Sequence, residues 1–236
     1  MAHDSHGSTV RLSLRQVDEI CTLLPTHDAW LSASELHRLQ SFQSASRRSH
    51  FLAGHWLARH TAALWLGGNW SAYQLSAPED AAPCWLAGPA DVEWQSVCVS
   101  LSHSGNWVAC ALAFQPIGVD VECSQQPRDF AALARWIFPD MELLAFLQLE
   151  PETQQQRFYT QWTLREAWVK QAGVDSLKPA MEAIQFVSGA GASSALVAHT
   201  RELTMAVYPA LRVDTHADET LLPTMQWFEW ACTPLR

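Results

Sequence analysis

WTLREAWVK at residues 162–170 and IGVDVE at residues 117–122 decide the fold of this chain. The IGVDVE segment alternates apolar and charged residues, as a half-buried strand does. Asp120 and Glu122 therefore share one face of that strand, and the valines between them face the core. The strand presents two carboxylates side by side.

The WTLREAWVK segment has the spacing of a helix, predicted over residues 152–172 and ending at Gly173. Glu166 and Lys170 are four residues apart and so are neighbours on its surface. Apolar side chains surround most of the remaining circumference. A helix with one narrow charged stripe is expected to be wedged inside the protein rather than to lie on its surface.

Three carboxylates in one site need a counter-charge. If Glu166 meets Asp120 and Glu122, each pair about 5 Å apart repels by roughly 3 kcal/mol at an effective dielectric near 20. A divalent cation removes this repulsion, and oxygen ligands favour Mg²⁺, with Mn²⁺ as the second candidate. The alternative is a solvated strand face together with a surface ion pair between Glu166 and Lys170.

The composition excludes several classes of protein. The chain has 236 residues, 48% of them hydrophobic, which is enough for one large domain or two small ones. A net charge of −9 disfavours binding to nucleic acid or to an anionic membrane. The sequence has no apolar run of about 20 residues and no signal-peptide pattern at its start, so we expect a cytoplasmic protein. Its six cysteines lack a C-x-x-C pair and are interpreted as buried thiols.

The element order predicts an α+β fold. Helices are expected to begin at Ser32, which opens a capping box with Glu35, and to cover residues 45–66, 130–137, 139–148 and 152–172. Strands are expected at residues 10–14, 97–101, 107–114, 117–122, 183–187, 195–199, 204–208 and 225–230, and a loop at residues 76–91. Because helices precede strands twice, we divide the chain into two similar halves, 1–114 and 115–236.

Two further groups of side chains suit the recognition of anions. Ser102-His103-Ser104 lacks the flanking glycines of a serine hydrolase elbow, so His103 is interpreted as a donor to an anion, or else as an ordinary loop histidine. Arginines 47, 48 and 59 on the predicted helix 45–66 suit phosphate recognition, or else are solvated.

Taken in order, these motifs resemble the 4′-phosphopantetheinyl transferases of the surfactin-synthetase-activating type. The resemblance is carried by residues 102–104, 118–122 and 158–173, and upstream by residues 31–35 and 51–59. It implies two α+β halves related by a pseudo-twofold axis, with coenzyme A bound between them. It also implies transfer of the phosphopantetheine arm to a serine of an apo acyl or peptidyl carrier protein, with release of adenosine 3′,5′-bisphosphate. We expect the enzyme to act as a monomer.

The resemblance also implies roles for individual residues. Magnesium is expected at Asp120, Glu122 and Glu166. The catalytic residues are expected to be Glu166 as the base, with Lys170 and His103 as phosphate contacts. The expected contacts with coenzyme A are Arg48, Arg59, Pro83, Ser102, His103 and Lys170.

Three positions depart from the family pattern. Arg165 stands where a lysine is common, and His55 stands where an arginine is common. A Gly-Lys-Pro segment that lines the adenine pocket is reduced to residues 81–83, Ala-Ala-Pro. The altered Gly-Lys-Pro segment motivates an alternative, a degenerate member that binds coenzyme A or a carrier without transfer. A further alternative is an unrelated metal-dependent phosphoesterase that uses the same carboxylates.

Overall fold

The computed structural model describes residues 8–79, 81–124, 128–173, 181–217, 219 and 221–235, and it has a mixed α+β fold. The helices are α1 (Val17–Leu23), α2 (Ala33–Ser41), α3 (Ala45–Leu66), α4 (Phe130–Ile137), α5 (Asp140–Leu147) and α6 (Pro151–Ala172). The strands before α4 are β1 (Thr9–Gln16), β2 (Gln74–Leu75), β3 (Trp85–Ala87), β4 (Cys98–Ser104), β5 (Trp107–Ala113) and β6 (Gly118–Cys123). Those after α6 are β7 (Ile184–Ser188), β8 (Ser194–His199), β9 (Leu203–Tyr208), β10 (Arg212–Thr215) and β11 (Trp227–Pro234).

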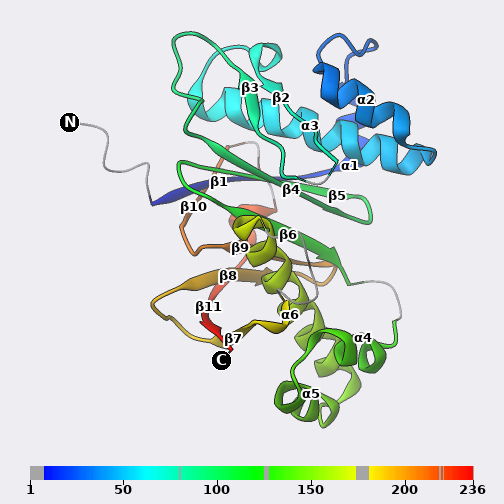
Figure 1. Ribbon diagram of the computed structural model, residues 1–236, viewed down its shortest axis with the longest axis vertical. Coiled ribbons are helices and arrows are strands. Elements are labelled where there is room, and N and C mark those ends of the chain that lie inside the picture. The colour runs from blue at the N-terminus through cyan, green and yellow to red at the C-terminus, as the bar shows by residue number, and fades with distance from the viewer. Residues whose placement is uncertain are drawn as a thin grey trace.

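Four layers build the molecule. One sheet has the strand order β10-β1-β5-β4 and is covered by α3, and a second sheet has the order β6-β9-β8-β11-β7 and is covered by α6 (Figure 1). Between the two sheets, Leu12 and Leu14 of β1 share a buried cluster with Val119 and Val121 of β6. The two sheets therefore pack face to face, and each has a long helix on its outer face.

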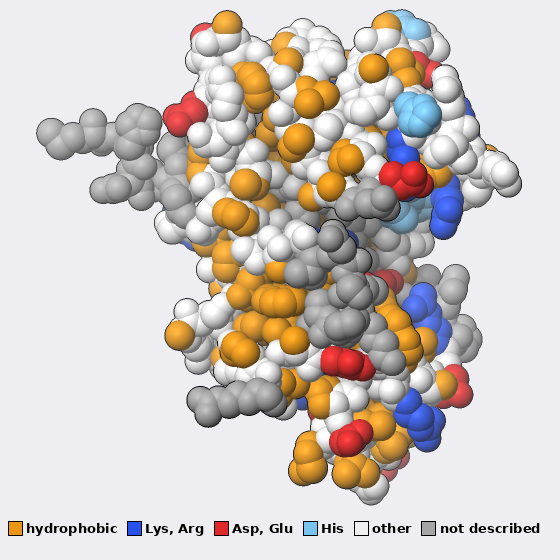
Figure 2. Space-filling model, viewed as in Figure 1, with side chains coloured by type: hydrophobic (Ala, Val, Ile, Leu, Met, Phe, Trp, Pro, Cys, Tyr) orange, Lys and Arg blue, Asp and Glu red, His pale blue; other side chains and the backbone are white. Residues whose placement is uncertain are grey.

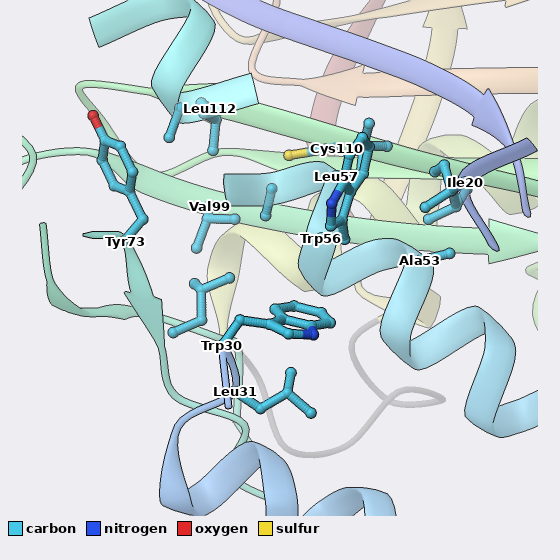
Figure 3. Close-up of a cluster of buried hydrophobic side chains, with 14 of the residues drawn as sticks. Ile20, Trp30, Leu31, Ala53, Trp56, Leu57, Tyr73, Val99, Cys110 and Leu112 are labelled. Atoms are coloured by element: carbon cyan, nitrogen blue, oxygen red, sulfur yellow. The ribbon is translucent and has the colours of Figure 1, made fainter. Parts of the chain in front are cut away.

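The outer faces have cores of their own. Beneath the helices of the first half, Ile20, Trp56 and Leu57 pack toward Cys110 and Leu112 of β5 (Figure 3). On the other side, Leu164 and Ala167 of α6 pack on Phe186 and Val197 of the second sheet. No helix within the described ranges is long and apolar enough to cross a membrane.

Most predicted elements are confirmed. The helices over 45–66 and 130–137 have the predicted bounds, and Ser32 and Glu35 form the predicted capping box. The α6 helix ends at Gly173, whose φ of 64° is left-handed. The predicted loop over 76–91 is wrong at residues 85–87, which form β3 against β2.

Other elements were not predicted. The short helix α1 follows β1 without a helix-capping side chain, so no start signal marks it. Strand β10, from the second half of the sequence, pairs in parallel with β1 and so extends the first sheet. Four exposed or half-buried residues at Arg212–Thr215 carry little strand pattern, because the pairing comes from a segment about two hundred residues away.

Each long helix holds one fully buried arginine. Arg59 of α3 donates to both carboxylate oxygens of Glu35 at 2.7 and 2.6 Å, and Arg165 of α6 donates to Glu142 at 2.7 Å. Each guanidinium also lies over an aromatic ring, that of Trp30 or that of Phe138 respectively. Both arginines lie fourteen residues after the first residue of a 22-residue helix.

The Glu35 carboxylate depends on its partners. Burial raises its pKa, but hydrogen bonds from His55 and Arg59 more than offset burial and lower the pKa to about 2. Because the folded pKa lies below the ordinary value of 4.5, ionised Glu35 stabilises the fold above pH 4.5. That stability is lost as the pH falls through about 2.

We predict that replacing Glu35 by Gln flattens the acid limb of the stability curve. Wild type should lose about 3 kcal/mol more than E35Q between pH 6 and pH 2, because one carboxylate with a depressed pKa is titrated. Urea unfolding at each pH measures this. Glu79→Gln, which removes an exposed partner of Arg38, is the control and should keep the wild-type slope. Parallel curves for wild type and E35Q would contradict the prediction.

Gly118 sets the distance between β6 and α6. A Cβ atom built on Gly118 would overlap the carbonyl oxygen of Ala167 in α6. Gly54 of α3 differs, since a Cβ atom there would meet Val108 at 3.5 Å, an ordinary contact.

We therefore expect Gly118→Ala to destabilise the protein by about 3 kcal/mol through overpacking against the helix backbone. Gly54→Ala should instead be neutral or stabilising by about 0.5 kcal/mol, because alanine is the better helix former and its methyl group has room. Denaturant midpoints of the two variants test the pair. Equal losses would show that β6 and α6 do not depend on this close approach.

Candidate active site

The carboxylates of β6 lie on the predicted face. Val119 and Val121 are fully buried between the sheets, and Asp120 and Glu122 point the other way, toward α6. Asp120 is buried, with 4% of its surface exposed, whereas Glu122 is half-buried. The predicted alternation along this strand is confirmed.

Three serines of β4 connect the two sheets at this point. The hydroxyls of Ser100, Ser102 and Ser104 accept hydrogen bonds from alternate backbone N–H groups of β6, at 3.0, 3.3 and 3.0 Å. We call these three residues the serine ladder. They satisfy N–H groups at the edge of β6 that no strand pairs with, because β4 belongs to the other sheet.

Two members of the serine ladder also hold the carboxylates. Ser102 donates its hydroxyl to Asp120 Oδ1 at 2.8 Å, and Ser104 donates to Glu122 Oε2 at 2.8 Å. Each hydroxyl therefore accepts from the β6 backbone and donates to a β6 side chain. This double use fixes the direction of both carboxylates relative to the strand.

The α6 helix supplies the other side of the site. Lys170 donates to Asp120 Oδ1 at 2.7 Å and to the carbonyl oxygen of Val119 at 3.2 Å. Trp162 donates its indole N–H to Glu122 Oε1 at 3.0 Å. Glu166 lies half-buried between these two positions in the helix sequence, so the structure brings together all three predicted carboxylates and the predicted lysine.

The carboxylates repel one another. Burial, the charge of Asp120 and, to a smaller extent, that of Glu122 together raise the pKa of Glu166 to about 7, although Lys170 opposes them. Burial and Asp120 also raise the pKa of Glu122, against the hydrogen bonds from Ser104 and Trp162. Glu166 is therefore an acid–base group that titrates near neutral pH.

A basic cavity of about 350 Å³ opens beside the serine ladder, between α3 and β4. Its lining includes Ser102 and His103, as predicted, together with Arg38, Arg47 and His50. Loss of surrounding water and the nearby groups His50, Lys170 and Arg47 lower the pKa of His103 to about 4. Histidine and basic side chains gather over α2 and the neighbouring end of α3 in Figure 2. Neutral His103 offers one N–H donor to an anion.

Four of the six predicted contacts are not among the residues that line this cavity, and one of them, Lys170, is bound to Asp120. Arg59 is fully buried against Glu35, Arg48 donates to the carbonyl oxygen of Leu39 at 2.8 Å, and Pro83 lies beside β3. His55 lines the cavity, and burial lowers its pKa even though Glu35 accepts its Nδ1 hydrogen bond. Arg165 is bound to Glu142 and Gln161 inside the second half, so its charge does not reach the site.

The sequence alone predicts no role for Arg38 or His50, and it contains Ser104 and Trp162 within the quoted motifs without giving them a role in the site. Trp162 lies four residues, about one helical turn, before Glu166, and Ser104 lies two residues after Ser102 on the strand, so helical and strand periodicity are signals that could have found them. No such local signal exists for Arg38, whose helix is brought to the cavity by tertiary packing.

The donor set suits a hard divalent cation in its chemistry. Three carboxylates from β6 and α6 supply oxygen ligands, and Asp120 Oδ2 is buried without a hydrogen-bond partner among the described residues. Among the described residues, no group of three or more His, Cys, Asp or Glu side chains is arranged so that it could hold a metal ion. Lys170 instead occupies Asp120 Oδ1.

Comparison with known proteins agrees with this site. The model of the 4′-phosphopantetheinyl transferase superfamily matches residues 116–207, which include β6 and α6. The 4′-phosphopantetheinyl transferase ffp of Bacillus subtilis is 30% identical over 158 residues, covering 62% of this chain and 67% of that protein. The chain belongs to the 4′-phosphopantetheinyl transferase superfamily.

Two other members of the superfamily match shorter stretches. HetI of Nostoc sp. is 30% identical over 61% of this chain and 60% of its own length. Sfp of Bacillus subtilis strain 168 is 36% identical over 31% of this chain and 32% of its own length. The chain thus spans less than two thirds of the length of these two superfamily members, and the matched region of HetI is the longer one.

The serine ladder makes a testable contribution to stability. Ser100→Ala should cost about 1–2 kcal/mol, because it leaves the buried N–H of Val119 without a partner. Ser102→Ala should cost about 1 kcal/mol more, since it also removes a hydrogen bond to a charged carboxylate. Chemical denaturation of both variants measures the difference. Equal losses would mean that the Ser102–Asp120 bond contributes nothing to the fold.

Proposed function

We propose that this protein transfers the 4′-phosphopantetheine arm of coenzyme A to a serine of an apo acyl or peptidyl carrier protein. The observation that supports this most is the junction between the two halves. Asp120, Glu122, Glu166 and Lys170 meet there, next to a cavity lined by His103 and two arginines. Carboxylate oxygens that can bind a cation, beside side chains that can donate hydrogen bonds to phosphate oxygens, suit a pyrophosphate substrate.

In the proposed reaction the carrier serine hydroxyl attacks the phosphorus that bears the pantetheine arm. A serine–oxygen to phosphorus bond forms and the bond to the adenosine 3′,5′-bisphosphate oxygen breaks. Glu166 accepts the hydroxyl proton, which makes the serine oxygen a better nucleophile. Lys170 and His103 donate hydrogen bonds to the phosphate oxygens on which negative charge builds.

Mg²⁺, or Mn²⁺ in its place, is proposed at Asp120, Glu122 and Glu166. The cation supplies Lewis-acid stabilisation of the pyrophosphate oxygens. The unpartnered Oδ2 of Asp120 and the mutual repulsion of the carboxylates support this assignment. Lys170 Nζ bonds Asp120 Oδ1 in the structure, and a cation bound by Asp120 would compete for that oxygen and leave the ammonium group to contact a phosphate.

We propose that the two halves, 1–114 and 115–236, are related by a pseudo-twofold axis. The order β1, α2, α3, β4, β5 in one half matches β6, α5, α6, β8, β9 in the other, with the same strand neighbours. The buried pairs Arg59–Glu35 and Arg165–Glu142 repeat the same device. Strand β10 is the exception, since it crosses from the second half to the first sheet.

For coenzyme A we propose the basic cavity, with Arg38 and Arg47 as phosphate contacts in addition to Ser102 and His103. Contacts of Arg48, Arg59 and Pro83 with coenzyme A stay predictions.

A protein substrate fits the surface near the site. Met141 and Leu144 of α5 are 80% and 60% exposed, and Trp136 of α4 is 42% exposed, with its ring centroid 6.3 Å from that of Trp162. Apolar side chains gather over α5 at the lower end of Figure 2. Exposed apolar groups of this size are typical of protein interaction surfaces.

The direct test is incubation with coenzyme A, Mg²⁺ and a panel of apo acyl and peptidyl carriers. Mass spectrometry of a carrier should show the addition of one phosphopantetheine group at its serine. If several carriers bind but none gains mass, the degenerate binder is the better description. Hydrolysis of simple phosphodiesters that survives Lys170→Ala would favour a phosphoesterase instead.

Glu166→Gln separates folding from chemistry. We expect a folded protein whose transfer rate falls by at least a hundredfold, the range that general bases contribute. Calorimetric titration should show weaker Mg²⁺ binding, because one anionic ligand is lost. Gln161→Ala, on the opposite side of α6 next to Phe186, is a control for disturbance of the helix. Near-normal turnover of E166Q would show that the assignment of the base is wrong.

A further inference from the structure

His55 of α3 lines the basic cavity, and the proposed transfer reaction gives it no role. Its side chain is 8% exposed, so protein encloses most of the imidazole. The ring packs on that of Phe51, another residue of the lining, with the two centroids 4.1 Å apart. The surrounding side chains therefore fix the orientation of the imidazole.

The contacts of Glu35 determine which ring nitrogen of His55 carries the proton. Although burial raises the pKa of Glu35, hydrogen bonds from His55 and Arg59 lower it to about 2, so Glu35 is a carboxylate at neutral pH. A carboxylate only accepts, so Nδ1 of His55, 2.6 Å from Glu35 Oε1, is the donor. Burial lowers the pKa of His55 although Glu35 opposes this, so the ring is neutral and its Nε2 is an acceptor.

This Nε2 is available to a ligand. It makes no hydrogen bond among the described residues, where the contacts of the His55 ring are those of Nδ1 and Phe51. Fully enclosed side-chain nitrogen and oxygen atoms without a partner occur elsewhere, for example Trp56 Nε1, but Nε2 of His55 is not one of them. The nitrogen therefore keeps accessible surface, and the surface of His55 that remains lines the cavity.

The charged groups around the cavity are donors. Arg38 and Arg47 are guanidinium groups, which only donate, and neutral His103 offers an N–H. His50 has its two ring nitrogens 2.6 and 2.7 Å from backbone carbonyl oxygens, so both are occupied. An anion that these donors hold in the cavity meets an acceptor, not a donor, at His55.

A set of donors that includes one fixed acceptor discriminates between anions. The hydrogen phosphate dianion has one O–H donor, whereas the sulfate dianion has a similar shape and the same charge but no donor. A sulfate oxygen against Nε2 would bring two lone pairs together, and a buried acceptor that lacks a donor is costly. A phosphate O–H directed at Nε2 removes that cost.

We propose that the basic cavity selects a phosphate group that carries a proton, which the phosphate O–H donates to His55 Nε2. The proposal rests on the proposed binding of coenzyme A in this cavity and names the class of phosphate that lies beside His55. A phosphate monoester binds its second proton with a pKa of about 6, whereas a pyrophosphate diester has no such proton. A monoester is therefore the group that fits. Arginine, the residue common in the family at position 55, would donate instead and would not make this distinction.

The test compares inorganic phosphate with sulfate at about pH 8, at equal ionic strength and without a divalent cation. Calorimetric titration measures both affinities, and ¹⁵N NMR of the histidine side chains, with His55 assigned by its loss in His55→Arg, locates the binding. We expect a saturable shift of the His55 Nε2 resonance with phosphate and at least tenfold weaker binding of sulfate. Equal affinities for the two anions, or no saturable shift with phosphate, would overturn the proposal.

Two variants of the cavity separate the acceptor from its neighbours. His55→Arg should bind the two anions with affinities within about threefold of each other, because a guanidinium group donates to either one. His103→Gln alters another group of the same lining, so it should weaken both anions and keep the preference for phosphate. A wild-type preference in H55R, or its loss in H103Q, would place the acceptor elsewhere and overturn the assignment to His55. The wild-type comparison decides the matter even if H55R does not fold.

Glu166→Gln distinguishes this inference from the proposed transfer reaction. Glu166 does not line the basic cavity, so E166Q should keep the preference for phosphate while transfer is lost. A wild-type protein that prefers phosphate but modifies no carrier would contradict the proposed function alone. An active transferase without the preference would overturn the role of His55 alone.

Discussion

The serine ladder is the constraint on which the rest of the site depends. An edge strand buried against another sheet has N–H groups that must be satisfied, and β6 has no strand on that side. Side-chain hydroxyls at every second residue of β4 accept those N–H groups and still have a proton to donate. The protons of Ser102 and Ser104 go to Asp120 and Glu122. The same serine hydroxyls thus join the two sheets and fix the side-chain orientation of Asp120 and Glu122.

The site also requires α6 to lie close to β6, and a residue of β6 itself makes this close contact possible. Gly118 lets the backbone of α6 lie directly against β6, which brings Trp162 and Lys170 within hydrogen-bond distance of Glu122 and Asp120. The buried Arg165–Glu142 pair holds the opposite side of α6 and leaves one stripe of the helix for the site. Removing either partner of such a pair leaves a buried charge, so the helix position is strongly constrained.

Sequence alone could predict the parts of this arrangement that depend on local periodicity. The valine and acid alternation of β6, the Glu166–Lys170 stripe and the bounds of α3 follow from residues near one another in the chain. The contact of Arg59 with Glu35 could not be predicted in this way. An arginine in a helix gives the same sequence pattern whether it binds a phosphate or a glutamate of another helix. The roles of Arg38 and β10 depend on contacts between distant segments, which no short pattern records.

Under the proposed pseudo-twofold relation β1 corresponds to β6, and the backbone N–H groups of the two strands are satisfied by different side chains. Where β6 has Ser102 to accept the N–H of Val121, β1 has the carboxylate of Glu219 to accept the N–H of Leu14. A hydroxyl that accepts one proton can donate another, so it stabilises acids on the strand beside it. A carboxylate can only accept, and Ser13 and Arg15 at the neighbouring positions supply it with a hydrogen bond and a positive charge. In the proposed relation, β6 therefore carries two acids that the serine ladder holds, whereas β1 carries residues that hold one acid from another segment, Glu219.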